Sequence, residues 1–134
     1  MNSIRLQFLV VAFLASNICN AQSKSAVDRG QTLFRANCGA CHSVTCNRQG
    51  PKLEGLFGRR AGSVSDFHQY TPGLTASGIV WTDETLDAYL SDPNKLVPGT
   101  TMAAFGRVEN AKDRKELIAY MRREDRSFEL CPKS

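Results

Sequence analysis

The chain has 134 residues, which is room for one domain, and its 17 basic and 13 acidic residues give a formal net charge of +4. So mild an excess of positive charge argues against nucleic-acid binding as the main task. Five cysteines occur, at positions 19, 38, 41, 46 and 131, and their placement indicates what kind of protein this is.

The first 21 residues are typical of a secretory signal peptide. Arg5 precedes an apolar run over residues 6–14, and the small residue Ala21 ends a plausible cleavage site at 19–21. The alternative is a membrane anchor, but the apolar run is shorter than the roughly 20 residues that span a bilayer. We therefore expect an exported, periplasmic protein with one domain over residues 22–134 and no stable membrane insertion.

A first helix is predicted over about residues 26–36. Ser25 and Asp28 have the spacing of a capping box at its start. Gly30 and Phe34 lie on one helical face. Because glycine inside a helix costs up to about 1 kcal/mol relative to alanine, we expect another helix to approach closely at Gly30.

Residues 38–42 read Cys-Gly-Ala-Cys-His, the C-x-x-C-H pattern of c-type haem attachment. In this pattern two thiols reach the two vinyl groups on one porphyrin edge, and the adjacent histidine reaches the iron. A zinc site would need a second pair of ligands, which does not follow, and a thioredoxin-like dithiol would need a βαβ pattern. The motif predicts one haem c, covalently bound through Cys38 and Cys41, with His42 on the iron.

The residues alone leave the second iron ligand open between Met102 and His68. Met102 lies in a loop whose backbone is restrained by Pro98 and Gly99, whereas Met121 lies in a helical pattern where methionine ordinarily fills a core. Loop position favours Met102 only modestly. His68 is the alternative ligand, although a single loop histidine is more often a solvated surface residue.

Almost 40 residues between His42 and Trp81 show little helical period and are rich in glycine. So long a loop is unusual in an ordinary domain. A haem ring would give its apolar residues something to pack against, so we expect loops that wrap the cofactor and a chain that is largely unfolded without it.

Two main helices and a short one are predicted in the second half of the chain. One begins after Thr82 as N-cap and stops before Pro93, and Asp92 and Pro93 start a short helix. The last covers about residues 111–125, capped by Asn110. No strand pairing is convincing, so the predicted fold class is all-α, with three main helices, short helices and long loops.

Taken together, these segments resemble class I c-type cytochromes, in the branch that includes mitochondrial cytochrome c and its bacterial periplasmic relatives. The resemblance extends from about Gly30 to Met121, nearly the whole chain after the predicted signal peptide. Its matching segments are Gly30-x-x-x-Phe34, residues 38–42, Gly50-Pro51-x-Leu53-x-Gly55, Gly58-Arg59, Tyr70-Thr71, Gly78-Ile79-x-Trp81, Tyr89-Leu90-x-x-Pro93, Pro98-Gly99-Thr100-x-Met102 and residues 117–120.

The resemblance implies the cytochrome c fold around one haem and a role for several residues. Met102 would be the distal iron ligand opposite His42, and the Pro51 carbonyl would accept a hydrogen bond from the His42 ring. Tyr89 would lie near the Met102 sulfur. The two buried haem propionates would be held by Arg59, Tyr70, Trp81 and Thr100.

Gly30 and Phe34 would meet the last helix near Leu117 and Tyr120 in a fold of this kind. The fold would also bring the segment after the haem motif close to the end of the last helix. On that basis, and because two cysteines remain in an oxidising compartment, we expect a disulfide between Cys46 and Cys131 rather than two free thiols.

The chain departs from the family pattern around the haem. Leu74 stands where the mitochondrial proteins carry an asparagine, and Thr101 replaces a lysine beside the ligand methionine. Ala104 lies where an aromatic residue usually borders the haem edge, with Phe105 one place later. Several lysines of the docking face are also absent, so the strength of partner docking is not implied by the resemblance.

The implied function is a monomeric one-electron carrier and not an enzyme. Its partners would be redox proteins such as a membrane oxidase, a reductase or a dehydrogenase, which Lys52, Lys95 and Arg107 could steer if they are acidic. The alternative is a peroxidase-like or ligand-binding haem protein in which Met102 leaves the iron readily. A subunit of a larger redox complex would also carry electrons.

Overall fold

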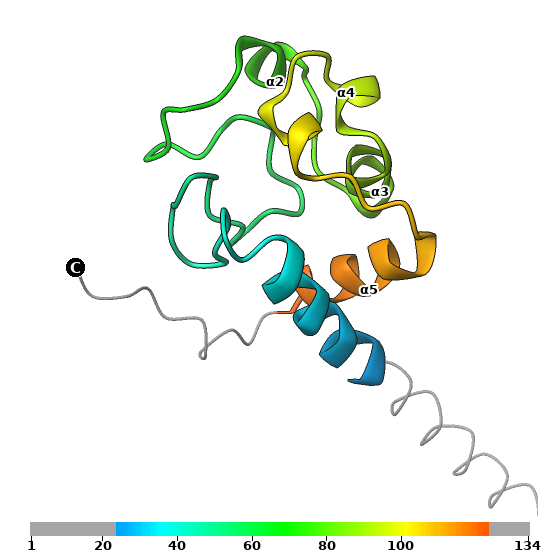
Figure 1. Ribbon diagram of the computed structural model, residues 1–134. Helices are drawn as coiled ribbons and strands as arrows, with labels where there is room; N and C mark the ends of the chain where they lie inside the picture. The colour runs from blue at the N-terminus through cyan, green and yellow to red at the C-terminus, as the bar shows by residue number, and fades with distance from the viewer. Residues whose placement is uncertain (1–23, 124–134) are drawn as a thin grey trace, which may run out of the picture.

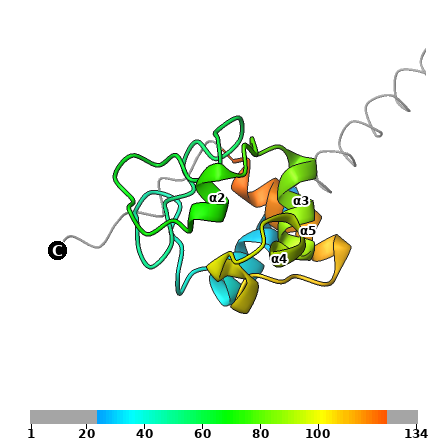
Figure 2. The same ribbon diagram turned by 90° about the horizontal axis from the view of Figure 1, so that it is seen from above.

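A computed structural model describes residues 24–123, and every structural statement below concerns these residues. The predicted signal peptide and Cys131 lie outside them. Figure 1 shows the first helix and α5 crossing on one side of the molecule, with α2, α3 and α4 beyond them and long loops between. Seen from above in Figure 2, the two crossing helices again lie against each other.

The first helix covers residues 24–37 of the described chain. It is longer than predicted at both ends, and Ser25 lies inside it, so the predicted cap at Ser25 is wrong. The helix ends where the amide groups of Cys38 and Gly39 both donate to the Phe34 carbonyl, each at 2.8 Å. That tightened turn leads directly into the C-x-x-C-H segment.

Helix α5 spans Ala111–Met121 and crosses the first helix at Gly30. A Cβ atom at Gly30 would overlap the Glu116 carbonyl oxygen and lie 2.8 Å from the Tyr120 Cβ. The rings of Phe34 and Tyr120 pack with centroids 5.4 Å apart, and the Leu117 side chain is fully buried. The predicted close contact between these helices is confirmed.

The predicted end of the last helix at residue 125 is wrong, because α5 ends at Met121. Met121 is its last buried residue, so a longer helix would present no further apolar side chain to the core. The Arg122 side chain instead contacts residues outside α5. Its guanidinium donates to Asp83 Oδ1 at 2.7 Å and lies 4.1 Å from the centre of the Phe57 ring.

Helices α3 (Asp83–Ser91) and α4 (Pro93–Leu96) follow the predicted capping signals. Thr82 and Thr85 form a reciprocal capping box at the start of α3. The Asp92 side chain accepts from the Lys95 amide and so begins α4, with Pro93 in its first turn. α3 is joined to α5 by the Arg114–Asp87 ion pair at 2.8 Å.

Two short elements were not predicted: α2 (Pro72–Ala76) and the 3-10 helix Thr101–Ala104. Thr71 caps α2 with Pro72 in its first turn, a signal that the sequence does contain. No β-strand occurs among residues 24–123, where the one extended pairing is an isolated antiparallel bridge between Arg60 and Val80. The predicted all-α class is confirmed. Within the same residues no helix is long and apolar enough to cross a membrane.

The helix crossing yields a test of stability. We expect Gly30→Ala to lower the free energy of unfolding by about 1–3 kcal/mol, because the added methyl group must displace the backbone of α5. This loss should outweigh the gain in helix propensity of up to about 1 kcal/mol. Denaturant unfolding of the haem-containing protein measures it. The exposed Thr32→Ala on the same helix is the control, and equal stability of the two variants would contradict the close contact.

Candidate functional site

A cavity of about 320 Å³ lies between the helices and the long loops. Its walls combine residues from the first helix, the C-x-x-C-H turn, the glycine-rich loops, α3, the 3-10 helix and α5. His68, the alternative iron ligand, is not among the lining residues. All ten residues predicted for the haem site do line it: Cys38, Cys41, His42, Pro51, Arg59, Tyr70, Trp81, Tyr89, Thr100 and Met102.

The C-x-x-C-H segment is a tight turn at the end of the first helix. The amide groups of Cys41 and His42 both donate to the Cys38 carbonyl, at 3.0 and 2.8 Å. This geometry brings both thiols and the imidazole to one cavity. Burial, with a smaller contribution from Cys41, raises the pKa of Cys38 to about 11, so its thiol is protonated near neutral pH.

The His42 ring is oriented by a hydrogen bond from Nδ1 to the Pro51 carbonyl oxygen at 2.9 Å. Since a carbonyl only accepts, the proton must be on Nδ1, and Nε2 keeps its lone pair. Burial lowers the pKa of His42, and the bond to Pro51 opposes that shift in part. The ring is therefore a neutral imidazole with one nitrogen available to a metal ion.

Gly50 packs directly against this ring. A Cβ atom there would lie 2.7 Å from both ring nitrogens of His42. The Gly50 amide donates to the Cys41 carbonyl at 2.8 Å, which holds the backbone in that position. Only glycine lets the loop approach the imidazole so closely.

Met102 lies on the 3-10 helix Thr101–Ala104 and is half-buried in the cavity wall. Its carbonyl accepts from Phe105 and Gly106, at 3.1 and 2.7 Å, which closes the turn behind it. A Cβ atom at Gly106 would overlap the Met102 methyl group. Met121 also lines the cavity, but it is 5% exposed and packs in the hydrophobic core, as expected of a core methionine.

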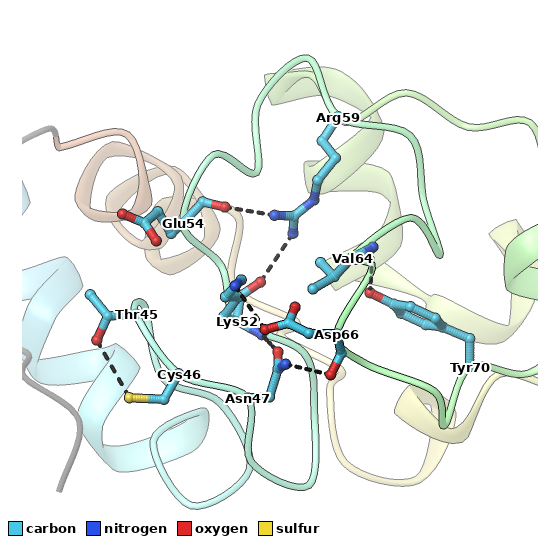
Figure 3. A network of polar contacts seen from close by, with 9 residues as sticks. All are labelled: Thr45, Cys46, Asn47, Lys52, Glu54, Arg59, Val64, Asp66 and Tyr70. Atoms are coloured by element: carbon cyan, nitrogen blue, oxygen red, sulfur yellow. Dashed lines mark hydrogen bonds and ion pairs between the residues drawn. The ribbon is translucent and has the colours of Figure 1, made fainter. Parts of the chain in front are cut away.

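Two of the four residues predicted to hold propionates, Arg59 and Tyr70, form hydrogen bonds with the backbone of the loops (Figure 3). Arg59 donates through Nη1 to the Glu54 carbonyl at 2.6 Å and through Nη2 to the Lys52 carbonyl at 3.1 Å. The Tyr70 hydroxyl accepts from the Val64 amide at 3.3 Å, and burial raises its pKa. These hydrogen bonds hold the Arg59 guanidinium and the Tyr70 hydroxyl in place without any contribution from a ligand.

α3 and the segment before Met102 also contribute to the cavity wall. The hydroxyl groups of Tyr89 and Thr100 are 2.6 Å apart, and both residues are buried. Burial raises the pKa of Tyr89. The Trp81 ring packs on that of Tyr89 with centroids 5.1 Å apart, so the three side chains form one packed unit.

Sequence reasoning missed several cavity residues. Gln49 accepts from the Cys41 thiol at 3.4 Å, and Arg60 lines the cavity beside Arg59. Phe67 packs edge-on against Tyr70, with ring centroids 4.9 Å apart. Neither Gln49 nor Phe67 belongs to a local motif, so only the folded loops could place them. Arg60 could have been suspected from the Arg59-Arg60 pair.

The cavity residues suit haem c. Two thiols and a neutral imidazole come from one turn, with the C-x-x-C-H spacing of covalent haem attachment. The rest of the wall is largely apolar, as a porphyrin ring demands, and includes Phe34, Leu53, Leu56, Leu86, Leu90 and Leu117. Among the described residues no group of three or more His, Cys, Asp or Glu side chains could hold a metal ion instead.

Comparison with known proteins agrees with this geometry. The Cytochrome c family profile matches residues 27–124. The chain is similar to cytochrome c of Gibberella zeae, at 46% identity over 99 residues that cover 72% of this chain and 92% of the relative. It is also similar to cytochrome c of Arabidopsis thaliana, at 43% identity with coverage of 72% and 87%.

Among solved structures, cytochrome cH from Methylobacterium extorquens has the same fold. Its TM-score is 0.66 at 37% identity, with 71% of this chain and 95% of that chain covered. The family match spans the helices, the C-x-x-C-H turn and both walls of the cavity. The chain is therefore a class I member of the cytochrome c family, an electron carrier with one haem c bound covalently through Cys38 and Cys41.

Proposed function

We propose that this protein is a monomeric one-electron carrier in which His42 and Met102 ligate the haem iron from opposite faces. One observation supports this proposal most directly. The His42 Nδ1 donates a hydrogen bond to the Pro51 carbonyl oxygen at 2.9 Å, which leaves Nε2 for the iron, and Met102 lines the same cavity as His42. His68, the competing ligand, does not line that cavity. Haem c supplies a ferric/ferrous couple, and a methionine sulfur favours the ferrous state.

Both ligand side chains are held tightly by the backbone, which suits electron transfer. Gly50 packs against the His42 ring, and Gly106 packs against the end of the Met102 side chain. This backbone contact limits the movement of each ligand on one side, so we expect little reorganisation on electron transfer. With both axial positions filled, no site remains for a substrate, which favours a carrier over a peroxidase-like protein.

The polar wall has a separate role in this proposal. Arg59, Tyr70, Trp81 and Thr100 would hold the propionates, and Tyr89 would lie beside the Met102 sulfur. Arg59 and Tyr70 bond to loop backbone, whereas Thr100 pairs with Tyr89. A guanidinium held by two carbonyl groups is well placed to offset propionate charge without moving.

Partners of the carrier would be other redox proteins, such as an oxidase, a reductase or a dehydrogenase. Of the three cations considered for steering, Lys52 pairs with Asp66 at 3.0 Å and Arg107 lies 3.9 Å from Glu109. Among the described residues Lys95 forms no salt bridge. We infer that electrostatic steering is weak and that the 78% exposed Phe105, on the cavity wall, contributes apolar contact.

Export to the periplasm completes the proposal. Its support is the sequence pattern of residues 1–21, in which a basic residue, an apolar run and a small residue follow in order. Cleavage after Ala21 would also remove Cys19. The mature chain would then hold four cysteines, of which the two outside the haem motif are Cys46 and Cys131.

The iron ligands are tested by visible absorption spectroscopy. We expect the wild-type protein to show a low-spin reduced spectrum and the weak far-red ferric band of a methionine sulfur ligand. Met102→Ala should lose that band and bind carbon monoxide when reduced. Met121→Leu, a change in the core, should keep the wild-type spectrum. A wild-type protein that is high-spin or binds carbon monoxide at once would favour the peroxidase-like or ligand-binding alternative.

Gly50 provides a test of the His42 side. Gly50→Ala should destabilise the ferric protein by about 1–3 kcal/mol, because the new methyl group presses on the imidazole. The bond to Pro51 should weaken, and the reduction potential should become more positive. Denaturant unfolding and spectroelectrochemistry measure the two effects. Gly73→Ala, whose Cβ would lie 3.0 Å from the Pro98 carbonyl, is the control. An unchanged potential in Gly50→Ala would contradict the close packing.

The disulfide is tested by thiol labelling. Cys38 and Cys41 are the free thiols of the described residues, and in the holoprotein both are consumed by haem attachment. Denatured, unreduced protein with mature N-terminus Gln22 should take up no alkylating agent, whereas prior reduction should expose two thiols. On the chain-entropy estimate, closing a loop of about 85 residues adds about 4 kcal/mol. Two labelled thiols before reduction would mean that Cys46 and Cys131 are not paired.

A further inference from the structure

The side chain of Asn47 joins two loops that lie far from each other in sequence (Figure 3). Its Oδ1 accepts from the Lys52 amide at 2.9 Å, and its Nδ2 donates to the Asp66 carbonyl at 2.9 Å. An amide N–H can only donate and a carbonyl can only accept, so these partners dictate the orientation of the Asn47 amide. The oxygen and the nitrogen of the Asn47 side chain are therefore both engaged in hydrogen bonds.

The first of these bonds acts beside Pro51. Proline has no N–H, so the position of its carbonyl depends on the peptide groups on either side. On one side the Gly50 amide donates to the Cys41 carbonyl at 2.8 Å. On the other side, the Lys52 N–H, which belongs to the same planar peptide group as the Pro51 carbonyl, donates to Asn47 Oδ1 at 2.9 Å. The peptide group that carries the acceptor for His42 is thus anchored directly by Asn47, and the residue before Pro51 is anchored by Cys41.

The second bond connects this turn to the segment over residues 64–70, whose last residue, Tyr70, lines the cavity. An ion pair between Lys52 Nζ and Asp66 Oδ2, 3.0 Å long, joins the same two loops. Asp66 is more than half exposed in this pair, and exposed pairs of this kind contribute little. The part-buried bond from the Lys52 amide to Asn47 is better protected from water, and the bond from Asn47 to the Asp66 carbonyl extends the same side chain to the second loop.

We propose that Asn47 is a positioning residue for electron transfer: it holds the Pro51 carbonyl where it accepts the hydrogen bond from His42 Nδ1. The proposal rests on the proposed ligation of the iron by His42. A hydrogen bond from Nδ1 to a carbonyl makes the imidazole a stronger donor to the metal, which favours the ferric state. Loss of the Asn47 contacts should loosen that bond and make the reduction potential more positive.

The test uses the holoprotein and reads the hydrogen bond directly. In the reduced, low-spin protein the His42 Nδ1 proton can be followed by NMR as it exchanges with deuterated water. We expect Asn47→Ala to exchange about threefold to tenfold faster than wild type, a change that corresponds to one hydrogen bond. Its potential, from spectroelectrochemistry, should become more positive. An unchanged exchange rate and potential would overturn the proposal.

Asn110→Ala is the matched control for a purely structural effect. Asn110 caps α5 through the amides of Lys112 and Asp113, so its loss lowers the melting temperature through contacts outside the haem cavity. We expect Asn110→Ala to leave both the Nδ1 exchange rate and the potential as in wild type. Equal changes in Asn47→Ala and Asn110→Ala would mean that Asn47 merely stabilises the fold, which would overturn the positioning role.

Asn47→Asp separates the two ends of the amide and remains informative if Asn47→Ala takes up no haem. The variant keeps the acceptor for Lys52 but loses the donor to Asp66, so its exchange should be faster than wild type and slower than that of Asn47→Ala. If the Nδ1 proton of Asn47→Asp exchanged as slowly as in wild type, the bond from Asn47 to the Asp66 carbonyl would have no part in positioning Pro51, and that part of the proposal would be wrong. The absorption spectrum of wild type is recorded first, because a spectrum without His/Met character would refute the proposed function itself.

Discussion

The hydrogen bond from His42 to the Pro51 carbonyl links the parts of this structure that matter for function. It sets the tautomer of the imidazole, and it joins the end of the first helix to the start of the glycine-rich loops. The bond can form only because residue 50 is glycine, since a side chain there would meet the ring. Loop and helix are thus coupled through one side chain.

A few short helices and long loops together enclose the apolar cavity. Two helices cross closely at Gly30 and provide one wall, while α3 and the loops provide the others. Polar groups on the walls are tied to one another, as Tyr89 is to Thr100, or to backbone carbonyls, as Arg59 is. Groups held in this way need not reorganise when charge on the iron changes, which is what an electron carrier requires.

The cavity edge carries two apolar residues at positions where the sequence departs from the family pattern described above. Leu74 and Phe105 both line the cavity, and Phe105 is at the same time largely exposed to solvent. Lys52 and Arg107 each lie beside an acidic side chain, Asp66 and Glu109. Under the proposed function, partner docking would then depend on apolar contact through Phe105 more than on charge.

The sequence by itself determined the class of this protein, because its main signals are local. These signals are the C-x-x-C-H motif, the capping residues of α3, α4 and α5, and the glycine at position 30, and each one has a direct physical meaning. It also indicated the residues that line the cavity, although for most of them only through the family resemblance. It misplaced both ends of the first helix and the end of α5, because helix ends depend on which side chains the core accepts. Only the tertiary structure decided the link from Asn47 to Asp66, the packing of Phe67 on Tyr70 and the approach of Gly50 to His42. Each of these contacts joins segments without regular periodicity, and no local rule relates such segments until the chain has folded around its cavity.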